Sequence, residues 1–490
     1  MSRFRTLIKW SLISIVLVAV IWLGVIIWWQ ATQRVVTLQD TLVYLGVLPL
    51  ALLICVGLLQ WRSFRARHPK PSHTEDATDE APAAAVESAP RLPILSAWAI
   101  TSFAADAEAF LHSVRDRKVR PMPDASLTDD QGFPVLTTRI ADLDTAALHD
   151  ELFRIVAKRK VEHAGDPENR RETLLRTLAL LARLLDQVLD DLPRHTHASA
   201  GTQAQPSGDA YTLRGHAASS SVSDHRLRLR VTLLIPAHFD PVEQQLAFAF
   251  LTQRIAALRV PGEYIYLDIR AAEDDATALA LMDQFSNESR HDRHAQALLL
   301  LACDSALCDT IAEDWQANGR LFNSRCPNGL MMGEAAFAVL CANDKAVKAA
   351  AATPACSLTR VIRARRDAPA DAPGKPSASC LSKVVQDALL AANLPGESIG
   401  TVSCDADHRS NRALECMGAM MEQTPHLDAI QNRLAAAEAC GHIGSASVTA
   451  ALVAAVMQSK DSEHPVLLFN VGHLIDRTAA VLIPSETATV

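Results

Sequence analysis

The chain has 490 residues and a formal net charge of -8, with 49% hydrophobic and 21% charged residues. This length allows two or three domains, and the composition is normal for a globular protein with added membrane segments. The weak negative charge comes without a basic stripe, which argues against nucleic-acid binding.

Two uncharged segments, residues 10–29 and 41–61, are each long enough to cross a bilayer as a helix. Basic residues lie before the first segment and after the second, whereas the connecting loop holds only Arg34. Because basic loops stay on the cytoplasmic side, residues 1–68 are predicted to form a two-helix membrane hairpin. We therefore expect a multi-pass protein of a bacterial inner membrane, in contact with lipid through these segments, with its soluble domain in the cytoplasm.

The ten cysteines agree with a reducing compartment. Nine of them follow residue 300, and they form no CxxC pair and no regular framework. This usage is typical of reduced thiols and not of a disulfide scaffold. Neither a metal nor another cofactor is expected, since no second ligand pair accompanies Cys404 and His408 or Cys440 and His442.

Residues 69–93 are rich in Ala, Pro and acidic residues and predict a flexible linker. Residues 94–224 predict an α/β or helical region, with apolar residues at helical spacing in 146–160 and 170–192 and a polar loop over 194–224. From residue 225 strands alternate with helices, which indicates a layered α/β domain up to residue 490. The predicted strands are 227–235, 264–269, 297–302, 335–342, 401–404, 466–470 and 479–483. The predicted helices are 242–258, 272–288, 380–392 and 448–457.

Several short segments in the last 200 residues carry a resemblance. They are a Gly333-Glu334 segment that leads into a strand, the helix 380–392 before strand 400–404, a Gly441-His442 loop before an apolar helix, and a final hairpin over 465–483. Their order resembles the β-ketoacyl synthase branch of the thiolase superfamily. The resemblance implies a thiolase-like layered α/β/α fold, in which His442 corresponds to a histidine that helps to bind an acyl thioester.

The resemblance breaks at the catalytic residues. The family's nucleophilic cysteine lies well before the Gly-Glu segment, yet no cysteine occurs between Cys55 and Cys303, and Cys303 is too close to Gly333. Asp405 falls near the family's first histidine; His408 could substitute but lacks the flanking glycines. We therefore expect a pseudoenzyme with no catalytic residue and a vestigial pocket, whose residues are Glu334, Asp405, His408, Gly441 and His442.

Simpler roles remain open for these residues. His442 could hydrogen-bond inside a packed loop, and Glu334 could accept backbone N–H groups at its turn. The charged segment from Asp405 to Arg412 is most simply a solvated loop, and alternatively a plug in the old pocket.

Two functions follow from the resemblance. The layout resembles the type VI lipase adaptor family, which implies a non-catalytic, membrane-tethered adaptor that loads a lipase effector onto a type VI secretion system. Its partners would be the effector or a protein of the secretion apparatus, and a homodimer is a further expectation. The alternative is a membrane-associated condensing enzyme of the β-ketoacyl synthase type that acts on acyl thioesters.

Overall fold

The computed structural model describes residues 91–159, 168–196, 227–256, 264–272, 276–374 and 376–485. Two halves with the same strand order form one hydrogen-bonded sheet of 13 strands. The first half orders its strands β5-β4-β6-β7-β1, and the second half orders them β11-β10-β12-β13-β8. The chain therefore repeats one supersecondary pattern twice.

In each half three strands are parallel and the next is antiparallel. The first half contains β1 (Leu92–Ile100), β4 (Arg228–Pro236), β5 (Ile265–Ala272), β6 (Gln296–Ser305) and β7 (Met332–Ala342). The second half contains β8 (Cys356–Leu358), β10 (Thr401–Cys404), β11 (Arg433–Ala435), β12 (Val466–Asn470) and β13 (Asp476–Pro484). β9 (Ile362–Arg365) pairs with β13, and the hairpin of β2 (Met122–Thr128) and β3 (Pro134–Thr138) lies beside β7.

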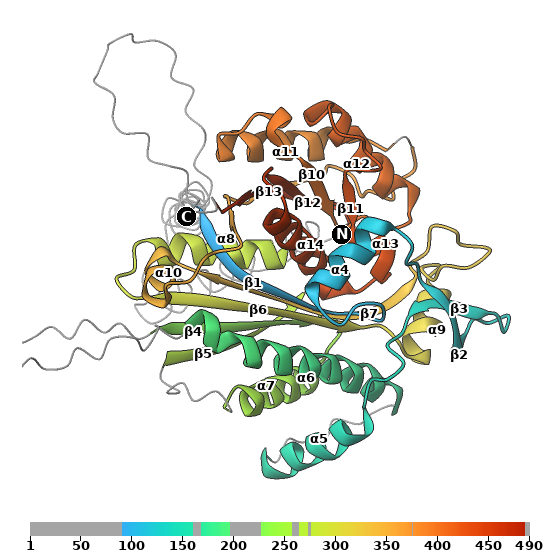
Figure 1. Cartoon of the computed structure of the whole chain (residues 1–490). Helices are drawn as coiled ribbons and strands as arrows, with labels where there is room; N and C mark the ends of the chain where they lie inside the picture. The colour runs from blue at the N-terminus through green and yellow to red at the C-terminus, as the bar shows by residue number, and fades with distance from the viewer. Residues whose placement is uncertain are drawn as a thin grey trace, which may run out of the picture. The chain divides into compact units, whose positions relative to one another are not determined.

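Helices cover both faces of each half, so sheet and helix layers alternate (Figure 1). Between the halves lie α4 (Ala107–Asp116), α8 (Thr277–Arg290) and α14 (Ser447–Asp461). α6 (Glu168–Thr196) and α7 (Pro241–Ile255) cover the outer face of the first half, and α11 (Ser379–Ala392) and α12 (Ser410–Gln423) cover that of the second. The shorter helices are α5 (Ala146–Arg159), α9 (Asp309–Ala317), α10 (Asp344–Ala350) and α13 (Ala436–Cys440), with 3-10 turns η3 (Gly396–Ser398) and η4 (Gly444–Ala446).

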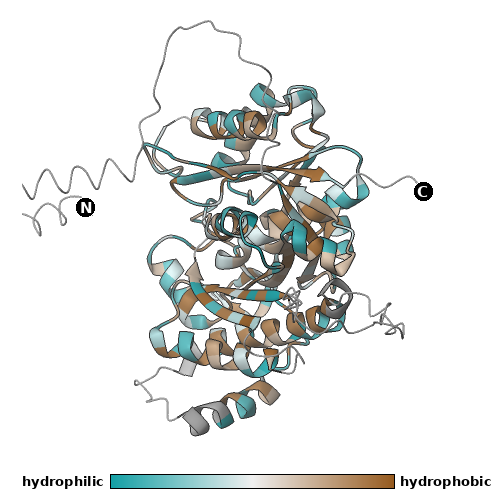
Figure 2. Cartoon of the chain, turned by 90° about the vertical axis from the view of Figure 1, so that its left-hand side faces the viewer, coloured by the Kyte–Doolittle hydropathy of each residue, from teal (hydrophilic) through white to brown (hydrophobic). Residues whose placement is uncertain are grey.

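The layering follows from where the apolar residues fall. Strand β7 is buried at every position and α14 on nearly all sides, as expected for elements covered on both faces. Figure 2 shows brown, hydrophobic residues along the strands and the helix faces that turn toward them, with teal on outer faces. Three large apolar clusters result, one between the halves and one under each outer pair of helices.

Strand β1 occupies the centre of the sheet. It pairs with β7 on one side and with β8 on the other, both of which lie after the boundary that the sequence suggested at residue 225. Residues 92–100 thus share one sheet with residues 332–342, and α6 packs on that sheet as well.

The expected multi-pass membrane location is corrected here. In the parts of the chain that the structure describes, no helix is both long enough and apolar enough to span a bilayer. The two expected spans, residues 10–29 and 41–61, and the linker 69–93 up to residue 90 lie outside these parts.

Candidate functional site

A cavity of about 910 Å³ opens where the carboxyl ends of the parallel strands of both halves meet. Pro236, Ala272 and Asp304 at the ends of β4, β5 and β6 line it from the first half, and Gly472 and His473, just after β12, from the second. Ligands of open α/β sheets bind at this edge, because the loops that carry side chains converge there. We therefore take this cavity as the candidate functional site.

His442 lines the cavity from the loop between α13 and η4. The preceding Gly441 has φ 67°, and a Cβ there would lie 3.0 Å from the carbonyl oxygen of Met331. The His442 backbone N–H donates to that same oxygen over 2.7 Å. Only a glycine lets the backbone approach the Met331 carbonyl oxygen this closely. The hydrogen bond then fixes the position of the His442 backbone, from which the imidazole extends.

An indole ring forms the wall beside His442. Trp315, on α9, stands edge-on to the imidazole, with ring centroids 5.3 Å apart. The guanidinium of Arg320 lies over the other part of this wall, 5.5 Å from the indole centroid. Both residues line the cavity, so its lining combines an aromatic face with a cation.

Two buried carboxylates fix the loops that surround the cavity. Asp304 accepts hydrogen bonds from the backbone N–H (2.8 Å) and the hydroxyl (3.0 Å) of Ser445, which ties β6 to η4. Asp405 accepts from the backbone N–H groups of Val471 and Gly472, at 2.6 and 3.1 Å. Asp405 thus fixes the loop after β12 and is 1% exposed.

The charged segment after β10 is buried, so its interpretation as a solvated loop is wrong. Arg412 is fully buried, and Asp407 and Arg409 are at most 7% exposed. Arg412 binds Asp371 and the carbonyl oxygen of Gly472, while Arg409 binds Asp407 over 2.7 Å. Burial raises the pKa of Asp371, but the positive charge of Arg412 outweighs it and holds this pKa below its ordinary value. Buried charges need such partners, and here the pairs support the cavity wall.

His408 and Glu334 lie elsewhere. The His408 ring stands edge-on to Phe322, with centroids 5.2 Å apart, and burial lowers the pKa of this histidine. Glu334 is 1% exposed and joins three segments, since it binds Arg176 on α6, the backbone N–H of Ile140 and the hydroxyl of Ser305. Of the expected pocket residues, His442 lines the cavity, and Gly441 and Asp405 hold its loops.

Cys308 lines this cavity at the N-cap of α9, and burial raises the pKa of its thiol. Burial raises the pKa values of Cys303 and Cys440, which disfavours the reactive thiolate. The sequence has no cysteine between Cys55 and Cys303. Within the described ranges no group of three His, Cys, Asp or Glu residues is placed to hold a metal ion.

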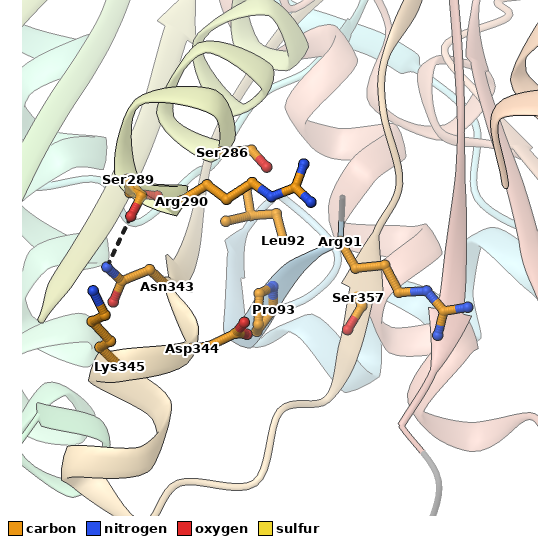
Figure 3. Close-up of a pocket in the computed structure, with 10 residues that line it drawn as sticks. All are labelled: Arg91, Leu92, Pro93, Ser286, Ser289, Arg290, Asn343, Asp344, Lys345 and Ser357. Carbon is orange, nitrogen blue, oxygen red and sulfur yellow. Dashed lines mark hydrogen bonds between the residues drawn. The ribbon is translucent and has the colours of Figure 1, made fainter. Parts of the chain in front are cut away.

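A second cavity, of about 490 Å³, lies at the opposite, amino ends of β1 and β6 (Figure 3). Arg91, Arg290 and Lys345 line it together with three serines, and Asn343 donates to the carbonyl oxygen of Ser289. Among the residues that line it, Ser357 on β8 alone belongs to the second half, so the site described above remains the stronger candidate.

The sequence did not point to Trp315, Arg320, His238 or His473, all of which line the main cavity. One signal was present, because His238 and His473 each follow a strongly apolar strand within three residues. Trp315 and Arg320 had no such signal, since their place depends on how α9 packs.

Comparison with known proteins gives the fold. No protein family model and no curated protein matches the chain. Among solved structures, the ishigamide ketosynthase/chain length factor superposes with a TM-score of 0.52 at 13% identity, over 81% of this chain and 100% of that one. A type II polyketide synthase ketosynthase, in complex with its acyl-carrier protein and bound to the hexaketide, gives 0.53 at 11% identity, over 81% and 100%. The ketosynthase from module 1 of the bacillaene synthase of Bacillus amyloliquefaciens FZB42 gives 0.52 at 14% identity, over 82% and 74%. The expected mixed α/β, thiolase-like fold is confirmed.

Proposed function

We propose that this chain is a degenerate relative of ketosynthases that binds an acyl thioester in the cavity beside His442 without forming a carbon–carbon bond. One observation carries the proposal. A cavity lined by an imidazole lies where the carboxyl ends of the parallel strands of both halves meet, while the sequence has no cysteine between Cys55 and Cys303.

The lining suits such a ligand. Trp315, Ile311 and Leu330 offer apolar surface to an acyl chain, and His442 offers a ring nitrogen to a thioester carbonyl. One of the similar solved structures is a ketosynthase in complex with its acyl-carrier protein, and that ketosynthase is bound to a hexaketide. A protein of this fold can therefore hold an acyl chain.

Condensation requires more than a binding cavity. The reacting acyl group must be transferred to a nucleophile, and loss of one member of a catalytic set removes most of its effect. The sequence resemblance puts Asp405 near the family's first histidine, and its carboxylate accepts hydrogen bonds from two backbone N–H groups. The condensing-enzyme alternative shares this fold and this ligand, and differs only in the covalent step.

The lipase-effector adaptor role rests on the sequence resemblance alone. The solved structures similar to this chain are ketosynthases, and no feature of the described residues points to a secretion effector. We therefore prefer the acyl-thioester proposal.

The test is a titration of the full-length protein with octanoyl-pantetheine, followed by the fluorescence of Trp315. We expect saturable quenching that is absent from Trp315→Phe. His442→Ala should bind about five- to tenfold more weakly, the loss expected for one hydrogen bond of about 1 kcal/mol. The matched control His112→Ala, on the exposed side of α4, should bind as the unchanged protein does.

Two results would contradict the proposal. Absence of saturable binding would show that the cavity does not bind an acyl thioester. An acyl group attached covalently to a cysteine, seen by mass spectrometry of the intact protein, would restore the condensing-enzyme alternative.

A further inference from the structure

Two buried thiols face each other between β10 and α12. Cys404 ends β10, Cys416 lies in the middle of α12, and their Sγ atoms are 3.9 Å apart. Both residues are fully buried. A disulfide needs an S–S distance of about 2.05 Å, so the two sulfur atoms would have to approach by about 2 Å.

A buried guanidinium lies beside this pair. Arg433, at the start of β11, is 4% exposed, and its Nη2 donates a hydrogen bond to the Glu438 carboxylate over 2.8 Å. Its Nε and Nη1 have no hydrogen-bond partner among the described residues. Two guanidinium nitrogens without hydrogen-bond partners cost free energy when buried, unless an anion lies close by. The nearby anion that this arrangement favours is a thiolate.

The charges also make the two thiols unequal. The hydrogen bond from Cys416 and the positive charge of Arg433 lower the pKa of Cys404, whereas burial raises the pKa of Cys416. An attacking thiolate and a resolving thiol are the two parts of a redox-active pair.

The pair sits between the two anchors of the cavity wall. Asp405, next to Cys404, binds the backbone N–H groups of Val471 and Gly472. Arg412, one helical turn before Cys416, binds both the Gly472 carbonyl oxygen and Asp371. A bond that draws α12 toward β10 therefore moves both anchors of Gly472 relative to each other.

We propose that Cys404 and Cys416 form a reversible disulfide on exposure to a peroxide, and that this bond reshapes the cavity wall at Gly472. The Cys404 thiolate attacks one peroxide oxygen, the O–O bond breaks, and the released hydroxide takes up a proton as water. Cys416 then attacks the sulfenic sulfur, the S–S bond forms, and the S–O bond breaks. The departing hydroxide leaves as a second water with the proton of Cys416. In total the two thiols lose two electrons and hydrogen peroxide gains them.

Peptide mapping tests the bond. The reduced full-length protein is treated with hydrogen peroxide, its free thiols are capped with iodoacetamide, and trypsin is added without reductant. Cleavage at Lys383, Arg409, Arg412 and Arg433 places Cys404 in residues 384–409 and Cys416 in residues 413–433, each as the sole cysteine. We expect these two peptides to be linked, at a mass two hydrogens below their sum, and to separate with dithiothreitol.

Variants separate this pair from the other thiols. In Cys416→Ser the linked pair is lost and Cys404 stops at the sulfenic acid, which dimedone traps. Arg433→Met slows the oxidation, because the thiolate loses its cation. The control Cys380→Ser, a half-buried thiol on α11, leaves the linked pair unchanged. Because the bond is measured directly in the unchanged protein, poor folding of a variant does not decide the test.

Trp315 reports on the wall. Its emission, taken as the difference from Trp315→Phe, should shift on oxidation and return on reduction. If peroxide oxidises Cys326 and Cys380 but leaves residues 384–409 and 413–433 unlinked, the disulfide is refuted. If the link forms and the emission of Trp315 stays constant, the effect on the cavity is refuted.

Discussion

At the residue scale, the buried ion pair of Arg176 and Glu334 shows how much one side chain contributes to stability. The pair is bidentate and almost fully buried, and it joins α6 to β7. Arg176→Met leaves Glu334 buried without its cation, so we expect a loss of about 3–5 kcal/mol in the free energy of unfolding. Urea titration measures it. The matched control is Arg183→Met on the same helix, whose partner Asp142 is exposed, and it should change the stability little. Equal losses in the two variants would contradict the role of Arg176.

The carboxylate of Asp124 gives a pH dependence. Burial raises its pKa, but hydrogen bonds from Ser126 and Arg139 outweigh this effect and hold the pKa at about 2, below the ordinary 3.8. A depressed pKa means that the folded protein binds this proton less readily than the unfolded chain does. The stabilisation is therefore present above about pH 4 and is lost as the pH falls toward about 2.

Asp124→Asn should remove this part of the acid sensitivity. We expect the difference in melting temperature between the unchanged protein and the variant to shrink as the pH falls from 5 to about 2.5. Asp116→Asn, at an exposed position on α4, is the control. A constant difference over this range would show that Asp124 does not titrate as described.

At the element scale, the loop between α13 and η4 depends on one glycine. Gly441 combines φ 67° with ψ -162°, a conformation that is nearly restricted to glycine, and a Cβ would press on Met331 and Met332. Gly441→Ala should cost about 1–3 kcal/mol of stability and displace His442, so that ligand binding weakens as well.

The matched control is Gly132→Ala in the β2–β3 hairpin. Gly132 also has a positive φ, 78°, but a Cβ there meets nothing within 4 Å. The control should lose stability alone and keep its affinity for octanoyl-pantetheine. If the Gly441→Ala protein bound octanoyl-pantetheine normally, the conformation of this loop would not control binding, which would contradict the prediction.

Helices and strands with a regular apolar pattern were predictable, and the charged ones were not. The strand predicted over 297–302 and the helix over 448–457 lie within β6 and α14, because their apolar residues exceed any competing signal. The start of α12 was interpreted as a solvated loop, since local sequence cannot show that Arg412 meets Asp371, which lies 41 residues earlier.

At the scale of the whole molecule, β5 is an edge strand. Among the described strands it pairs with β4 alone, and Tyr266 on it is 59% exposed. Open strand edges favour pairing with another chain. The homodimer expected from the sequence could form here, by pairing of β5 with its copy in a second chain.

Light scattering after gel filtration tests this expectation. A dimer of the 53.0 kDa chain should appear at twice that mass, and Tyr266→Lys should shift it toward the monomer by placing like charges face to face. The control Phe248→Lys lies on the covering helix α7 and not on the edge strand itself. A monomeric unchanged protein, or equal dissociation of both variants, would contradict pairing through β5.

The sequence by itself determined the alternation of apolar strands and helices, the Gly441-His442 loop and the lack of a cysteine between Cys55 and Cys303. These are local properties, since periodicity, glycine conformation and residue identity are all written within a few neighbouring positions. Only the tertiary structure placed β1 at the centre of the sheet, brought Trp315 to His442, buried Arg412 and set Cys404 against Cys416. Each of these features depends on contacts between different helices, strands or loops. The free energy of such packing depends on the whole fold and not on the local sequence.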